Sequence, residues 1–154
     1  MRPTKESYFL SMAELASSRG TCCRRKVGAV LVNKRGHIIG TGYNGTPMGM
    51  DHCTRSNPCA GGSYPSGEGL DKCEALHAEQ NALLQCKDVF EIHTAYVTTS
   101  PCMHCTKLLL NTSCKRIIFK EEYPAPDAKA LWLKAGREWI NISGIKLKDL
   151  TEED

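Results

Sequence analysis

The alternation of strand-like and helix-like segments most limits how this chain can fold. Two segments rich in β-branched residues, 26–33 and 37–44, flank a polar turn and predict a β-hairpin. Further along, predicted helices alternate with predicted strands, and this order favours crossover connections and parallel strand pairs. We therefore predict an α/β fold, with three α/β/α layers around a central five-stranded mixed sheet. The helices are expected at 6–19, 77–86, 100–111 and 125–139, and the remaining strands at 94–99, 115–120 and 144–150.

Length and charge restrict the class of protein. The 154 residues suit a single domain spanning 1–154. Lysine and arginine number 20 against 17 acidic residues, so the net charge of +3 is too weak to indicate a stable nucleic-acid partner, although it suits a small anionic substrate. The N-terminal segment has no signal-peptide pattern, and no apolar run has the length of about 18 residues that a membrane span needs. We expect a cytoplasmic protein with no membrane association.

Nine cysteines are more than ordinary core packing requires. The number is odd, and without a secretory signal a disulfide framework is not expected. Metal binding or catalysis is the better interpretation. Cys86 and Cys114 lie in apolar segments, and we interpret these two as small buried apolar side chains.

The cysteines and histidines include one specific metal-binding pattern. His77 and Glu79 form H-x-E, and Cys102 and Cys105 form P-C-x-x-C after Pro101. This is the spacing of zinc-dependent deaminases. One histidine and two cysteines leave the fourth tetrahedral position of zinc for water, as a catalytic site requires. Glu79 is then the general acid and base rather than a ligand.

The alternative for this pattern is a structural zinc with His104 as its fourth ligand, which would leave no place for water. Both Cys102 and His77 stand at predicted helix starts, where the helix dipole stabilises thiolates.

The chain resembles the zinc-dependent cytidine deaminase superfamily, and within it the deoxycytidylate (dCMP) deaminases. The resemblance rests on CCRRKVGAVLV, GTGYNGTPMG, HAEQNAL, YVTTSPCMHCTKLL and the later EEY. It implies hydrolytic deamination of dCMP to dUMP, in which a zinc-activated water attacks C4 of cytosine. Glu79 protonates N3 and then the departing amine.

The resemblance also implies substrate contacts, each with a simpler structural alternative. Asn44 would face the 3′-hydroxyl of deoxyribose; the alternative is that it only stabilises a turn. Arg24, Arg25 and Lys26 stand where a 5′-phosphate would lie, or they form a solvated cluster of charges. Tyr123 would line the base pocket, or it only packs. The resemblance also places Ala78 among the substrate-binding residues.

Members of this family are often hexamers activated by dCTP and inhibited by dTTP. The resemblance therefore implies a homo-oligomer and an effector site over the glycine-rich segment, with Mg²⁺ accompanying dCTP. Glycines let a backbone approach phosphate closely, although no Walker A lysine follows. The residues expected at this effector site are Gly42, Asn44, Gly45 and Gly49.

Four further cysteines suggest a second, structural zinc, which some family members carry in the same loop. Cys53, Cys59 and Cys73 fall in the long loop, and Cys22 precedes the first strand. Four thiolates suit a closed tetrahedral site. Cys23 is an equal candidate to Cys22, and His52 is a possible substitute ligand. The alternative is a set of free thiols.

Two other functions fit parts of the sequence. The first is a related zinc deaminase acting on another nucleoside, nucleotide or nucleic-acid base. A channel for nucleic acid needs basic and aromatic residues, and aromatics are only 6% of this chain. The second is a zinc-stapled nucleic-acid-binding module, which would have no use for Glu79.

Overall fold

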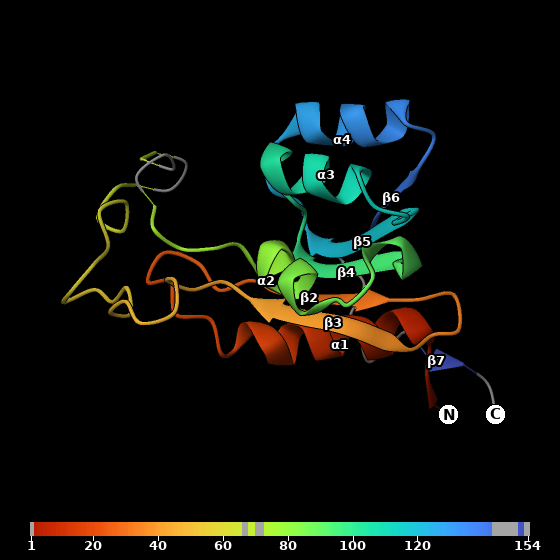
Figure 1. Cartoon of the computed structure of the whole chain (residues 1–154), viewed down its shortest axis with the longest axis horizontal. Helices are drawn as coiled ribbons and strands as arrows, with labels where there is room; N and C mark the ends of the chain where they lie inside the picture. Colours follow the sequence, from red (N-terminus) through yellow and green to blue (C-terminus); the bar gives the residue numbers. More distant parts are fainter. Residues whose placement is uncertain (1, 66–67, 70–72, 143–150, 153–154) are drawn as a thin grey trace.

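The computed structural model describes residues 2–65, 68–69, 73–142 and 151–152 (Figure 1). The helices among them are α1 (Lys5–Ser17), α2 (Ala78–Gln85), the 3₁₀ helix η2 (Val89–Glu91), α3 (Met103–Leu110) and α4 (Pro126–Lys134). The strands are β1 (Arg2–Pro3), β2 (Gly28–Val32), β3 (Ile38–Tyr43), β4 (Thr94–Thr99), β5 (Arg116–Glu121), β6 (Glu138–Asn141) and β7 (Thr151–Glu152).

Five of these strands form one mixed sheet in the order β3-β2-β4-β5-β6. The hairpin strands are antiparallel to each other, and β2 is also antiparallel to β4. The β4–β5 and β5–β6 pairs are parallel, each joined by a crossover helix. The predicted hairpin, the crossovers and the five-stranded α/β/α fold are confirmed. The short pair β1–β7 was not predicted.

The fifth strand lies where the sequence predicted the end of a helix. We predicted helix over 125–139, but α4 ends at Lys134 and residues 138–141 form β6. Gly136 has φ of +78°, a left-handed conformation that ends a helix and that glycine adopts without steric cost. The expected strand at 144–150 lies outside the described residues.

Helices cover both faces of the sheet (Figure 1). On one face α1 buries Phe9, Leu10 and Ala13 against the sheet. On the other face α2, α3 and α4 pack over a larger core that includes Leu109 and Trp132. Strand β2 is buried along its whole length because both layers cover it.

Two glycines let the helices approach the hairpin unusually closely. A Cβ at Gly42 of β3 would overlap the backbone oxygen of Ala78 in α2, and one at Gly28 of β2 would overlap that of Ala13 in α1. Helix α2 therefore lies directly on β3, and its first turn is held beside the end of that strand. Among the described residues, no helix has the length and apolar character needed to cross a bilayer.

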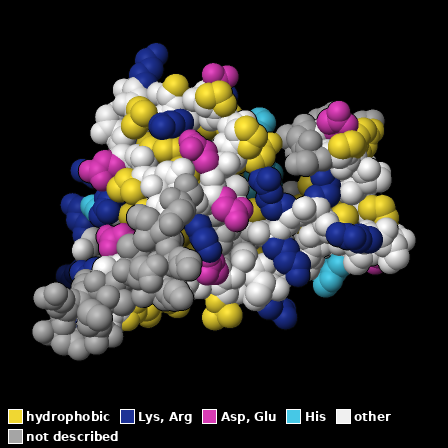
Figure 2. Space-filling model, turned by 180° about the vertical axis from the view of Figure 1, so that it is seen from behind, with side chains coloured by type: hydrophobic (Ala, Val, Ile, Leu, Met, Phe, Trp, Pro, Cys, Tyr) yellow, Lys and Arg dark blue, Asp and Glu magenta, His cyan; other side chains and the backbone are white. Residues whose placement is uncertain are grey.

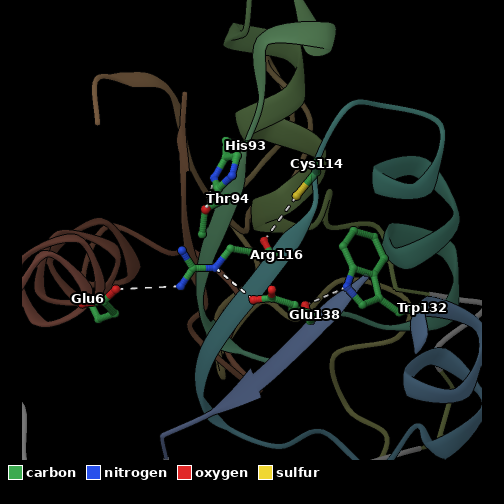
Figure 3. A network of polar contacts seen from close by, with 7 residues as sticks. All are labelled: Glu6, His93, Thr94, Cys114, Arg116, Trp132 and Glu138. Atoms are coloured by element: carbon green, nitrogen blue, oxygen red, sulfur yellow. Dashed lines mark hydrogen bonds and ion pairs between the residues drawn. The ribbon is translucent and has the colours of Figure 1, made fainter. Parts of the chain in front are cut away.

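At the other end of the sheet, Arg116 joins three elements (Figure 3). Its guanidinium lies 3.8 Å from Glu6 of α1 and 3.4 Å from Glu138 of β6. The indole Nε1 of Trp132 donates to the backbone oxygen of Glu138 at 2.8 Å, which ties α4 to the same strand. These contacts fix the edge strand β6 against the rest of the sheet.

Candidate active site

Two helix starts bring the predicted metal ligands together. His77 is the N-cap residue of α2 and Cys102 is the N-cap residue of α3. The His77 Nδ1 atom lies 3.4 Å from Cys102 Sγ and 3.3 Å from Cys105 Sγ. Among the described residues this trio is the only group of three metal-ligating side chains whose ligand atoms all lie within 4.8 Å of one another.

The geometry of the trio suits zinc. A tetrahedral ion with typical Zn–N and Zn–S bonds separates a nitrogen and a sulfur ligand by about 3.6 Å, close to the distances found here. His104 is exposed on α3 and does not join the group. The alternative with His104 as fourth ligand is therefore not favoured.

The pKa values of the two thiols are shifted in opposite directions. Hydrogen bonds from Cys105 and His77 lower the pKa of Cys102 to about 3, although burial opposes the shift. The pKa of Cys105 is raised, because it faces the Cys102 thiolate and is buried. The hydrogen bond to Cys102 also raises the pKa of His77. Metal binding requires both thiols and the coordinating nitrogen of His77 to be deprotonated, so an ion that binds here would release protons.

Glu79 lies in the first turn of α2 and is buried, with 4% exposure. Burial raises the pKa of its carboxyl group, and the positive charge of His77 acts in the opposite direction. The carboxylate also interacts with the Cys105 thiol, which places it beside the trio. A carboxyl group with a raised pKa next to a metal position is suited to carry protons.

A cavity of about 350 Å³ opens onto His77 and Cys102 of this trio. Its walls come from the segment before β2, the end of β3, the start of α2, the end of β4 and the segment after β5. Of the residues proposed from sequence, the cavity walls include Arg24, Asn44, Ala78, Glu79 and Tyr123. The volume suits a mononucleotide rather than a macromolecule.

The Asn44 side chain holds the backbone of the neighbouring segment. Its Oδ1 accepts from the N–H of Val27 at 2.8 Å, and its Nδ2 donates to the oxygen of Arg25 at 2.7 Å. The amide oxygen can still accept one more hydrogen bond, and the amide nitrogen can still donate one more. Asn44 therefore combines the structural role with a place in the cavity wall.

The three basic residues before β2 take different positions. Arg24 donates to the backbone oxygens of Gly61 at 2.9 Å and Pro65 at 2.7 Å. The Arg25 guanidinium lies 5.2 Å from the ring centre of Tyr123, and both residues line the cavity. Lys26 is exposed and is not among the cavity residues. Figure 2 shows basic side chains gathered where the projecting loop meets the body of the domain.

Packing and backbone conformation explain most of the glycines in the glycine-rich segment. Gly42 is required by the packing of α2 described above. Gly45 pairs with Leu76, so the loop begins and ends beside His77. Gly49 has φ of +84° and open space around it.

The loop cysteines are free and form a looser cluster than the trio. The Cys23 and Cys53 sulfurs lie 3.2 Å apart, and the Cys59 N–H donates to Cys53 Sγ at 3.3 Å. Burial would raise the pKa of Cys53, but these hydrogen bonds outweigh it and lower the value to about 7. Cys22 and Cys73 also line the cavity, and Cys73 interacts with both Cys59 and Cys22. The structure thus places Cys23, rather than Cys22, beside Cys53. Of the two cysteines predicted to be small core residues, Cys114 is fully buried and Cys86 is half-buried.

Sequence reasoning missed several cavity residues, among them Tyr64, Thr99 and Ser100. Ser100 Oγ accepts from the N–H of Tyr123 at 2.7 Å and so holds that residue at the cavity wall. Its position directly before the P-C-x-x-C motif was a usable signal. Tyr64 comes from the long loop, and no sequence pattern indicated its place in the cavity.

A histidine and two cysteines around a metal position, with a buried glutamate, define the site of a metal-dependent hydrolase on an α/β/α fold. The family described as "Cytidine and deoxycytidylate deaminase zinc-binding region" matches residues 3–121, and the chain belongs to this family. Over 137 residues the chain is 37% identical to a deoxycytidylate deaminase of Schizosaccharomyces pombe. That match covers 87% of this chain and only 42% of the relative.

Two phage proteins match over nearly their whole length. A deoxycytidylate deaminase of Mycobacterium phage D29 is 39% identical over 127 residues, which cover 79% of this chain and 98% of the relative. The crystal structure of dCMP deaminase from the cyanophage S-TIM5 in complex with dCMP and dUMP is similar, with a TM-score of 0.72 and 30% identity. This match covers 92% of this chain and 99% of the cyanophage chain.

Proposed function

We propose that this chain deaminates dCMP to dUMP and ammonia by hydrolysis. The observation that carries the proposal is the buried carboxyl group of Glu79, held beside the His77–Cys102–Cys105 trio at the floor of a nucleotide-sized cavity. The similarity to deoxycytidylate deaminases of both phages and to that of S. pombe supports dCMP as the substrate.

The residues of the chain have distinct parts in this reaction. Zinc held by His77, Cys102 and Cys105 would supply a Lewis acid that lowers the pKa of water toward neutrality. Glu79 accepts a proton from the attacking water and delivers protons to N3 of cytosine and then to the leaving amine. A C4–O bond forms, the C4–N bond breaks, and one water is consumed for each ammonia released.

The remaining cavity residues bind and orient dCMP. Arg24 and Arg25 face the position of the 5′-phosphate, while Asn44 offers its remaining donor and acceptor to the deoxyribose. Tyr123 and Ala78 enclose the base. Lys26 acts only at longer range, because it is exposed outside the cavity wall.

Ammonia release tests this proposal directly. Zinc-loaded protein is offered dCMP, deoxycytidine, dCTP and single-stranded DNA in parallel. We expect turnover of dCMP alone. Glu79→Gln should reduce kcat by a factor of about 10²–10⁴ or more with unchanged zinc content, since a general acid–base contributes that much. Turnover of another substrate would overturn the assignment of dCMP, and salt-sensitive DNA binding without any turnover would favour the binding module.

The same proposal includes control by nucleotides and a second zinc. We expect dCTP with Mg²⁺ to activate and dTTP to inhibit a homo-oligomer, most simply a hexamer, through the segment that contains Gly45 and Gly49. A hyperbolic dCMP saturation curve that dCTP does not change would contradict this.

Metal analysis should find two zinc ions per chain, the second held by Cys53, Cys59, Cys73 and either Cys22 or Cys23. One zinc per fully loaded chain would exclude it.

A further inference from the structure

A second cavity, of about 600 Å³, lies at the opposite end of the sheet from the active site. It is formed by the β2–β3 turn, by η2 and by the residues that precede β4 and β5. Strand β4 separates it from the active site, and the six residues Thr94–Thr99 span roughly 17–20 Å. Nothing in the proposed reaction uses this cavity.

Backbone hydrogen bonds hold the walls of this cavity in place. Asn33 Oδ1 accepts from the N–H groups of Arg35 at 3.0 Å and His37 at 2.9 Å, which fixes the turn. The N–H of His93 donates to Val32 at 2.8 Å, and the N–H of Lys115 donates to His93 at 2.9 Å. Three segments distant in sequence are therefore held together before any ligand arrives, and little ordering of the backbone is needed on binding.

The cavity concentrates positive charge that the described residues do not neutralise. Lys34, Arg35 and Lys115 line it, and within the described part of the chain none of them forms an ion pair. Glu91 is the one carboxylate among the lining residues. Burial, together with the charges of Arg116, Lys115 and Lys34, holds the pKa of His93 below its usual value, although Glu138 opposes the shift.

An exposed aromatic ring completes the wall. Phe90 of η2 is 71% exposed, and its backbone N–H is bound by Asp88 Oδ1 at 2.9 Å. The His93 ring stands beside Thr94, at the same end of the sheet as Arg116 (Figure 3). Lysine and arginine bind phosphate oxygens, and an exposed aromatic face stacks on a base.

We propose that this cavity binds a polyphosphorylated nucleotide at a site separate from the active site. Lys34, Arg35 and Lys115 contact the phosphates, and Phe90 stacks on the base. The volume accommodates one nucleotide, and the limited size of the cavity favours a small ligand over a continuous strand of nucleic acid. The proposal does not depend on the activity assigned to the other end of the sheet.

Isothermal titration of the full, zinc-loaded chain with ATP, tripolyphosphate and adenosine tests the site. ATP is the probe because a purine does not suit a cytosine pocket. We expect ATP to bind more tightly than tripolyphosphate, adenosine to bind most weakly, and saturating dUMP not to displace ATP. Lys34→Glu and Lys115→Glu should each weaken ATP about tenfold or more, roughly the loss of one charge-assisted contact.

Two further variants separate this site from general charge effects. Lys134→Glu reverses an exposed charge on α4 and should leave ATP affinity unchanged. Phe90→Ala should weaken ATP by about fivefold to a hundredfold without changing tripolyphosphate, because only stacking is lost. Equal losses in Lys115→Glu and Lys134→Glu, displacement of ATP by dUMP, or much tighter binding of a single-stranded oligonucleotide would each overturn the proposal.

Discussion

The side-chain oxygen Oε1 of Gln80 accepts a hydrogen bond from the backbone N–H of His77 at 2.7 Å. Gln80 thereby fixes the backbone of a predicted metal ligand at the first turn of α2. The next residue, Asn81, donates from Nδ2 to the oxygen of Tyr43 at 2.8 Å and anchors the same turn to the end of β3. The position of His77 thus depends on two neighbouring side chains that do not bind metal.

Gln80→Ala should weaken zinc binding. The backbone of His77 would lose its acceptor, and outer groups that orient a ligand typically contribute about 10–100-fold to metal affinity. Zinc affinity measured by competition with a chelator checks this. Gln80→Glu keeps an acceptor at the same position and is the matched control, which should retain most of the affinity. Equal affinities in Gln80→Ala and the unmodified chain would show that the hydrogen bond does not position His77.

Gly42→Ala should destabilise the fold and disturb the metal site together. The added methyl group overlaps the backbone of α2 at Ala78, directly after His77. Overpacking of this kind typically costs about 1–3 kcal/mol in the free energy of unfolding. Urea denaturation and zinc titration measure the two effects. Thr41→Ala in the same strand loses only one side-chain contact and serves as the control. A changed dCTP response at unaltered stability would instead favour an effector role for Gly42.

Arg137→Met should destabilise the protein without affecting the catalytic residues. The Arg137 guanidinium donates to four backbone oxygens at the end of α3 and just beyond, those of Leu109, Leu110, Thr112 and Cys114. It also stacks on Trp132, 5.2 Å from the ring centre. Charge-assisted hydrogen bonds contribute about 1.5–3 kcal/mol each, and partial solvation reduces the net loss to about 2–4 kcal/mol. Chemical denaturation checks this value, and Arg137→Lys should recover part of it. A loss below 1 kcal/mol would contradict the role.

The stability of the protein should fall as the pH drops below about 7, partly through His93, whose unfolded pKa is about 6.5. Burial, together with the charges of Arg116, Lys115 and Lys34, lowers the pKa of this imidazole in the fold, while Glu138 opposes the shift. The unfolded chain therefore binds the proton more readily, and stability is lost as the pH falls through the unfolded and then the folded pKa.

Denaturation at several pH values in a phosphate-free buffer measures this slope. His93→Gln keeps a polar side chain without the titration and should flatten the curve. His104→Gln changes an exposed histidine on α3 and is the matched control. An unchanged slope in His93→Gln would show that other groups set the pH dependence.

The metal site was the part of this protein most open to prediction from sequence. His77, Glu79, Cys102 and Cys105 occur in two short motifs at helix starts, and the local geometry of an N-cap is encoded within a few residues. The sheet could also be predicted, because the hydrophobic pattern of each strand and the order of the elements can be read from short segments of the sequence. The predicted helix over 125–139 was wrong at its C-terminal end because residues 135–139 have mixed propensity. Only the left-handed Gly136 and the pairing with β5 separate helix from strand there.

The class of fold and the grouping of His77, Cys102 and Cys105 could both be predicted from the sequence, because each depends on local spacing. Tertiary structure decided which side chains meet across the fold. It placed Arg25 over Tyr123 and left Lys26 outside the cavity, and it assigned Gly42 to helix packing. It also gathered Lys34, Phe90 and Lys115 around a second cavity. These relationships join segments that are distant in the sequence, and the order in which the strands pair across the sheet brings those segments together.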